Sequence, residues 1–194
     1  MRSPRLFLKS YFPEKDDEAI NITAQVIKRL HKAPIPSTHT FPHIKDWLGS
    51  LDNDWNIPHG YLQKSRNLCG QLLKTAGPDV LLHGDLHHDN ILQNGNDWLA
   101  IDPKGVIGEP AYELAAFIRN PIPELLNHAN APNTIHKRVT GFAELLELPS
   151  QRILDWCFVQ AVLAWVWAIE DGCDTDYFER ATTIMADIQR LISR

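Results

Sequence analysis

Residues 83–90 read HGDLHHDN and place three histidines and two aspartates directly after the apolar run VLL at 80–82. So many titratable side chains in one short segment indicate a site that performs chemistry. Two kinds of site use these residue types. One is a zinc centre, in which imidazole and carboxylate groups are ligands. The other is the catalytic loop of an enzyme that transfers a phosphoryl group.

The spacing of the histidines is poor for zinc. A zinc site needs three or four converging ligands, usually as a close pair on one element and a second pair elsewhere. His87 and His88 are adjacent, so on an extended segment their side chains point to opposite sides. The HExxH signature is absent, and the remaining histidines lack ligand spacing. A zinc-dependent hydrolase is therefore the less favoured hypothesis.

The same segment fits phosphoryl transfer better. In protein kinases a catalytic aspartate is followed, after four residues, by an asparagine that binds Mg²⁺. Asp85 and Asn90 have this spacing, and Asp102 follows in the segment IDP. Asp85 is thus the predicted catalytic carboxylate, and Asn90 and Asp102 are the predicted ligands of Mg²⁺ and, through it, of the ATP phosphates. His83 is interpreted as a hydrogen-bonded residue that orients the loop.

A β-hairpin is expected to bring Asn90 and Asp102 together. The apolar runs ILQ at 91–93 and WLAI at 98–101 flank the segment NGND, which is a strong hairpin signal. Both residues then lie at the open end of the hairpin, where cross-strand neighbours are about 5 Å apart. An odd number of loop residues favours side chains on the same face, and an even number opposes it.

Most of the remaining sequence has helical periodicity. Helices are predicted over about 17–32, 44–51, 61–73, 110–118, 133–146, 150–169 and 174–192. The expected fold is therefore mainly α with a small β-hairpin. With 194 residues, of which 44% are hydrophobic, the chain can bury one sizeable core.

Composition excludes several classes of partner. The formal net charge is −5 and no run of Lys and Arg occurs, so nucleic acid is not an expected partner. The longest apolar stretch, around 159–169, is too short to span a bilayer, and the first residues lack a secretory signal. We therefore predict a soluble cytoplasmic protein. The unevenly spaced Cys69, Cys157 and Cys173 are expected to be reduced thiols, two of them packed in helices.

Three motifs resemble a known family: VLLHGDLHHDNIL at 80–92, IDPKGVIGEPAYELA at 101–115 and WAIEDG at 167–172. They are similar to the aminoglycoside phosphotransferase group of the kinase-like superfamily, in the aminoglycoside/hydroxyurea antibiotic resistance kinase branch that includes the streptomycin 6-kinases. The resemblance implies Mg²⁺- and ATP-dependent phosphorylation of a hydroxyl group on a small molecule. The family commonly carries aspartate where this chain has Glu109 and Glu113.

The resemblance also implies a domain organisation. Residues 1–15 correspond to a remnant of the hinge and the N-terminal lobe, in which RLFL at 5–8 resembles the hinge strand. Residues 16–194 correspond to the C-terminal helical lobe of a protein-kinase-like fold whose N-terminal lobe is largely absent. Two hypotheses follow from this. The first is a small-molecule kinase that is active alone or with the missing lobe supplied by a neighbouring chain. The second is a non-catalytic remnant that binds Mg²⁺ or a ligand weakly and serves as a binding module.

An acidic cluster follows the predicted helix that carries Trp165 and Trp167. Glu170, Asp171 and Asp174 are candidate contacts for a cationic, polyhydroxylated acceptor such as an aminoglycoside, since a cleft lined by one charge sign concentrates the opposite sign. The alternative is a capped, solvated turn between two helices. The same two alternatives, substrate contact or a solvated turn, apply to the loop residues at 87–89, His87 among them.

Overall fold

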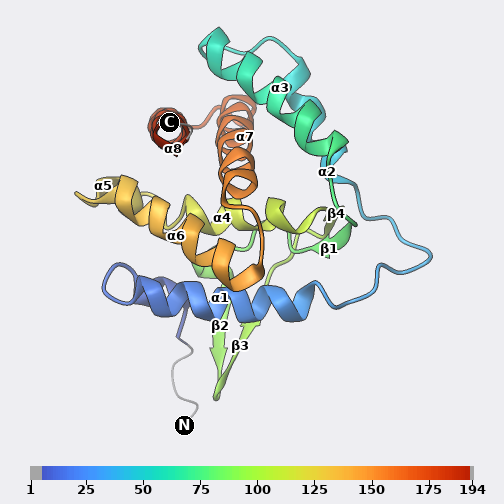
Figure 1. Cartoon of the computed structure of the whole chain (residues 1–194), viewed down its shortest axis with the longest axis vertical. Helices are drawn as coiled ribbons and strands as arrows, with labels where there is room; N and C mark the ends of the chain where they lie inside the picture. Colours follow the sequence, from blue (N-terminus) through green and yellow to red (C-terminus); the bar gives the residue numbers. More distant parts are fainter. Residues whose placement is uncertain (1–5, 193–194) are drawn as a thin grey trace.

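Helices form most of the computed structural model, which describes residues 6–192 (Figure 1). Its α-helices are α1 (Asp16–Leu30), α2 (Ile44–Leu48), α3 (His59–Lys74), α4 (Leu114–Ile118), α5 (Glu124–Asn127), α6 (Ala131–Leu146), α7 (Ser150–Glu170) and α8 (Asp176–Ile192). Short 3-10 helices cover Leu8–Tyr11, Gly49–Asp52, His88–Asn90 and Pro110–Glu113. The prediction of a mainly α fold with a small hairpin is confirmed.

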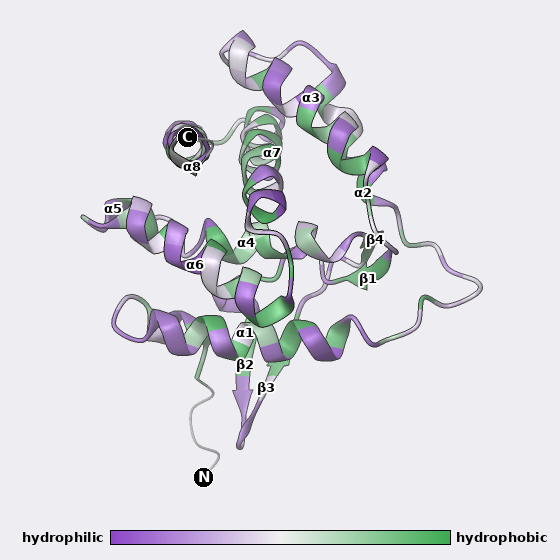
Figure 2. Cartoon of the chain, in the orientation of Figure 1, coloured by the Kyte–Doolittle hydropathy of each residue, from purple (hydrophilic) through white to green (hydrophobic). Residues whose placement is uncertain are grey.

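Helix α7 is the centre of the core, with α3, α4, α6 and α8 packed around it. Its residues from Ile153 to Val166 are buried on nearly every side, apart from Asp155. Much of α7 is coloured as hydrophobic in Figure 2, and a helix that is apolar on most of its faces needs neighbours on all sides. The apolar stretch around 159–169 was predicted to be too short to span a bilayer. The helix that contains it is long and apolar enough to do so by length and composition. Its most apolar window is 78% buried within the protein, however.

A buried arginine ties α1, α4 and α6 together. Arg138 of α6 is fully buried, and its guanidinium donates two hydrogen bonds to the Asp16 carboxylate in the first turn of α1, at 2.9 and 2.6 Å. Its Nη1 also donates to the backbone carbonyls of Phe117, Ile118 and Asn120, at the end of α4. The Phe117 carbonyl also accepts the Asn120 N–H, at 3.1 Å, and Arg138 adds a side-chain cap to the carbonyls at the C-terminal end of α4.

The predicted hairpin consists of β2 (Ile91–Asn94) and β3 (Asp97–Ala100), which pair antiparallel around a two-residue turn, Gly95 and Asn96. Gly95 has a φ of +63°, which suits glycine at such a turn. On the other edge of β2, Gln93 N–H donates to the Leu6 carbonyl, and Phe7 forms a bridge with Leu92. The described end of the RLFL segment therefore lies along the hairpin; residues 1–5 lie outside the described part of the chain.

A second small sheet was not predicted. Strand β1 (Val80–Leu82) pairs antiparallel with β4 (Val106–Gly108), so two segments far apart in sequence lie side by side. A run of three apolar residues is too short for its pattern to predict a strand. This sheet matters for function because β1 leads directly into the HGD segment and β4 leads directly to Glu109.

Candidate active site

The HGD segment turns sharply at the end of β1. Gly84 has a φ of +84°, and a Cβ at this position would lie 2.8 Å from the ring of Trp47, so only glycine fits here. His83 is buried; its Nε2 donates to the Ile101 carbonyl at 2.8 Å, while its Nδ1 accepts from the Asp85 N–H at 3.3 Å. His83 thus joins this loop to the hairpin, which matches its interpretation as an orienting residue.

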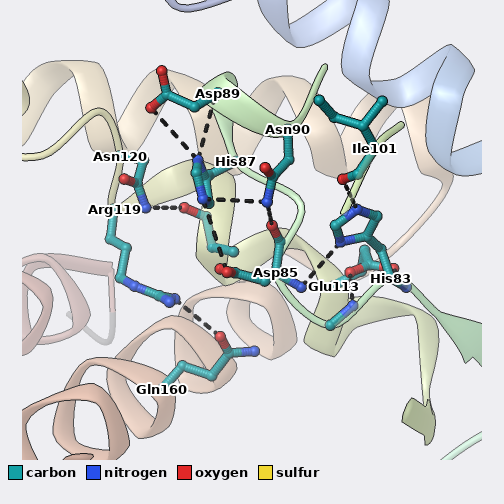
Figure 3. Close-up of polar contacts among 12 residues, drawn as sticks. His83, Asp85, His87, Asp89, Asn90, Ile101, Glu113, Arg119, Asn120 and Gln160 are labelled. Atoms are coloured by element: carbon teal, nitrogen blue, oxygen red, sulfur yellow. Dashed lines mark hydrogen bonds and ion pairs between the residues drawn. The ribbon is translucent and has the colours of Figure 1, made fainter. Parts of the chain in front are cut away.

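Glu113 holds the backbone immediately before Asp85 (Figure 3). Its buried carboxylate accepts the N–H of His83 at 2.7 Å and the N–H of Gly84 at 3.0 Å. His31, at the end of α1, places its Nε2 3.6 Å from the same carboxylate. Two hydrogen bonds to a charged acceptor fix this turn far more strongly than neutral contacts would. The sequence analysis identified Glu113 only as a position where the family commonly carries aspartate.

Glu109 lies away from this loop and has a structural role. Its buried carboxylate forms an ion pair with Arg152 of α7, at 2.6 Å, and accepts a hydrogen bond from the indole N–H of Trp156. Burial raises the pKa of Glu109, although the hydrogen bond and charge of Arg152 oppose that effect. The IGEP segment is thereby anchored to the core helix.

Asp85 and Asn90 belong to one closed loop. The Asn90 side-chain Nδ2 donates to the backbone carbonyl of Asp85 at 2.9 Å, so the amide is fixed across the loop. No described residue donates a hydrogen bond to the Asn90 Oδ1, which leaves this oxygen available. The Asp85 carboxylate is half-buried, and the Nε2 atom of His87 lies 3.8 Å from its Oδ2.

Asp102 lies one residue beyond the partner of Asn90. The Ile101 N–H donates to the Asn90 carbonyl at 3.0 Å, and the turn has an even number of residues, so a regular pleat would place Asp102 on the opposite face from Asn90. Strand β3 has ended by then, however, and Asp102 has a φ of +56°. This left-handed conformation interrupts the pleat, so loop parity no longer decides the direction of the side chain. Asp102 is exposed and forms no ion pair with any described residue.

The three loop histidines have three different environments. His87 is half-buried and lies in a turn, with its ring nitrogens 3.3 Å from the Asp89 N–H and the Asn90 Nδ2. A neutral imidazole accepts at only one nitrogen, so one of these contacts is a hydrogen bond at a time. Burial lowers the pKa of His87, against the opposing influence of Asp85 and Asp89.

His88 is neither solvated nor near a substrate site, which corrects both alternatives for this residue. It is completely buried, stacks on Phe117 with ring centroids 3.9 Å apart, and lies 3.4 Å from Arg138. Burial, reinforced by the charge of Arg138, holds its pKa well below the usual range, so the ring is neutral. Within residues 6–192 no group of three or more His, Cys, Asp and Glu is arranged to hold a metal. The zinc hypothesis therefore receives no support from these histidines.

A cavity of about 480 Å³ opens beside Asp85. Trp47 and Trp167 form part of its wall, with ring centroids 6.0 Å apart in an edge-to-face arrangement. His87 also lines it. Trp165, by contrast, is 3% exposed and belongs to the core. Aromatic walls with a few polar groups are typical of sites for small molecules.

Only one residue of the acidic cluster lines this cavity. Asp171 lines it, together with the exposed thiol of Cys173, whereas Glu170 and Asp174 do not. Asp174 instead accepts the backbone N–H of Asp176 and caps the start of α8. For Asp174 the structure thus shows a capped turn between two helices, which was the alternative to a contact with the acceptor. Cys69 and Cys157 are buried in α3 and α7, and all three thiols are free, as predicted.

Sequence reasoning missed several side chains of the cavity, among them Arg119 and Gln160. Arg119 lies at the end of α4, and its Nη1 donates to the Oε1 of Gln160, a buried residue of α7, at 3.0 Å. Both line the cavity with Asp85. The available signal was a lone arginine at the end of the apolar run LAAFI, and a lone glutamine within the apolar α7.

The donor set is suitable for Mg²⁺. Magnesium prefers oxygen ligands and is usually held by one or two carboxylates together with substrate phosphates. Asp85, Asn90 and Asp102 offer two carboxylates without a Lys or Arg partner and one amide oxygen without a hydrogen bond among the described residues. These are groups that a cation can satisfy.

Comparison with known proteins finds one matching family model and several relatives. The family model described as aminoglycoside/hydroxyurea antibiotic resistance kinase matches residues 3–172. The chain is 31% identical over 166 residues to the streptomycin 3''-kinase of Klebsiella pneumoniae, covering 81% of this chain and 60% of that kinase. It is 27% identical over 172 residues to the streptomycin 6-kinase of Streptomyces griseus, covering 82% and 54%. The chain thus spans little more than half the length of these relatives.

The fold is kinase-like. A thermostable mutant of aminoglycoside phosphotransferase APH(4)-Ia, crystallised in a ternary complex with AMP-PNP and hygromycin B, superposes with a TM-score of 0.69 at 15% identity. The match covers 97% of this chain and 70% of that one. At this level of identity the likeness shows the fold, which confirms the predicted kinase-like architecture.

Proposed function

We propose that this chain, which belongs to the aminoglycoside/hydroxyurea antibiotic resistance kinase family, transfers a phosphoryl group from ATP to a hydroxyl group of a small molecule. The observation that supports this most strongly is the position of Asp85. Its carboxylate has no Lys or Arg partner among the described residues, its backbone is held through Gly84 and Glu113, and it lines the aromatic cavity.

In this proposal Asp85 accepts the proton of the acceptor hydroxyl as the phosphoryl group is transferred. A carboxylate that is fixed in place and not neutralised by a cation is suited to this role. His83 and Glu113 are positioning residues, because they hold the backbone on either side of Gly84 without lining the cavity. Neutral His87 leaves the charge of Asp85 uncompensated.

Asn90 and Asp102 are the proposed ligands for Mg²⁺. When bound, the ion neutralises charge on the phosphates of ATP and orients them. The contribution of this chain is to supply the oxygen ligands: the amide of Asn90 is locked through its nitrogen to the Asp85 carbonyl, so its oxygen needs no reorganisation on binding.

The proposed acceptor is a polyhydroxylated molecule with a cationic group, such as an aminoglycoside. The rings of Trp47 and Trp167 provide flat apolar surfaces for a sugar-like ring, and Asp171 provides a negative charge at the same cavity. Two curated relatives are named as streptomycin kinases, which agrees with this class of acceptor.

We further propose that residues 16–194 form the C-terminal lobe of the kinase-like fold and that the segment before them is the end of the hinge. Kinases grip the α- and β-phosphates with a lysine on an N-terminal-lobe strand, and none of the strands within residues 6–192 carries a lysine. This observation favours a second candidate function, in which residues 6–192 bind the acceptor and Mg²⁺ and transfer depends on a lysine outside them.

The experiment combines calorimetric titration of the purified chain with Mg²⁺ and ATP with a phosphoryl-transfer assay on a panel of aminoglycosides. Asp85→Asn is expected to lower transfer at least about 100-fold because the proton acceptor is lost. Asp187→Asn, on the exposed face of α8, is the matched control and should be neutral. Transfer that survives Asp85→Asn undiminished refutes the role of this carboxylate. Binding without transfer in the wild type supports the second candidate.

A further inference from the structure

The cavity beside Asp85 contains a guanidinium group without a counter-ion. Arg119 donates one hydrogen bond, from Nη1 to the neutral amide oxygen of Gln160. Its Nε is buried and has no hydrogen-bond partner, and no carboxylate lies within 4.0 Å of the guanidinium in the part of the chain that the structure describes. By contrast, buried Arg138 and half-buried Arg152 each have a carboxylate partner.

This arrangement is costly unless a ligand completes it. Withdrawing a cation from water is unfavourable when no opposite charge is supplied, and an amide oxygen does not supply one. Gln160 is itself fixed, because its Nε2 donates to the Tyr112 carbonyl at 2.5 Å. The amide therefore presents its oxygen to Arg119 and holds the guanidinium in place (Figure 3). No described residue accepts a hydrogen bond from the Arg119 Nη2, so this end of the guanidinium is available to an incoming acceptor.

The charge that the proposed reaction brings into this cavity is negative. A phosphate ester carries about −1.5 to −2 charges at neutral pH, and it forms on a hydroxyl that Asp85, already an anion, contacts. Arg119 and Lys104 are the cationic side chains that line the cavity, and Lys104 is exposed. A guanidinium fork matches the geometry of phosphoryl oxygens better than an ammonium group does.

We infer that Arg119 is an oxyanion-binding residue of this cavity, which holds a phosphoryl oxygen of the phosphorylated acceptor and is oriented for this by Gln160. The inference rests on the proposed function and adds to it a residue that binds the transferred group. It also divides the cavity into a cationic end at Arg119 and an anionic end at Asp171.

The test uses inorganic phosphate as the probe and the full chain, and calorimetry measures the binding. Wild type should bind phosphate saturably, and Arg119→Gln should weaken binding at least about tenfold, as expected for one charge-assisted contact. Arg190→Gln removes an arginine from the exposed face of α8 and is the matched control, with unchanged binding.

Gln160→Glu keeps Arg119 but gives it an internal carboxylate, so it should also weaken phosphate binding at least about tenfold if circular dichroism shows a folded chain. Wild-type phosphate affinity in either variant, or no phosphate binding by wild type, overturns the inference. A parallel titration with streptomycin tests whether Arg119 contacts the unphosphorylated acceptor instead of the phosphoryl group. In that case Arg119→Gln would weaken streptomycin binding and leave phosphate binding intact, and this result also overturns the inference. Failure here leaves the Asp85→Asn transfer test of the proposed function unaffected.

Discussion

Replacing Glu113 by glutamine should destabilise the protein by about 2–3 kcal/mol. The carboxylate accepts two backbone N–H groups, at 2.7 and 3.0 Å, and each such bond to a charged acceptor contributes about 1.5–3 kcal/mol. Glutamine keeps one oxygen acceptor and turns an NH₂ group toward the second N–H. The relief of burying a neutral group instead of a carboxylate offsets part of the loss.

Urea denaturation followed by circular dichroism measures this difference, with Glu144→Gln as the control. Glu144 is exposed on α6, so its replacement should change the free energy of unfolding by less than about 0.5 kcal/mol. Phosphoryl transfer should fall further than stability alone explains, because a shift of about 1 Å at Asp85 can cost about 100-fold in rate. A Glu113→Gln protein that is as stable and as active as Glu144→Gln would refute the anchoring role.

Two other predictions concern the acceptor cavity and the core. Iodoacetamide should alkylate only Cys173, because burial raises the pKa of Cys69 to about 12 and also raises that of Cys157. Bound streptomycin should slow the alkylation of Cys173, which lines the cavity. Equal rates with and without streptomycin, measured by mass spectrometry of peptides, would count against the proposed acceptor site. Arg138→Met should lower the free energy of unfolding by about 3–5 kcal/mol in urea denaturation, because it leaves Asp16 and the end of α4 without their partner; a loss below about 1 kcal/mol would contradict that role.

The parts of the fold that local patterns determine were predictable. Its length and apolar content predicted helix α7, and the segment Asn94-Gly95-Asn96-Asp97 between two short apolar runs predicted the hairpin. The pairing of β1 with β4 was not predictable, because it joins residues 80–82 to 106–108 and neither run is long enough to show a period. Tertiary contact, rather than propensity, makes these strands.

The candidate site was predictable in its residue types and less so in its geometry. The spacing of Asp85 and Asn90 pointed to one loop, and the hydrogen bond between them closes it. His88 was misread because adjacent histidines look alike in sequence, yet one enters the core and the other stays at the cavity. Arg119 was missed because its role depends on Gln160, which lies 41 residues further along the chain.

Binding of Mn²⁺ in place of Mg²⁺, followed by electron paramagnetic resonance in the presence of ATP, tests the central claim most directly. If Asn90 and Asp102 hold one cation beside Asp85, the wild type binds Mn²⁺, and Asn90→Ala and Asp102→Asn each weaken its binding at least about tenfold. Asp187→Asn should bind like the wild type. Unchanged Mn²⁺ binding in both Asn90→Ala and Asp102→Asn would contradict the account.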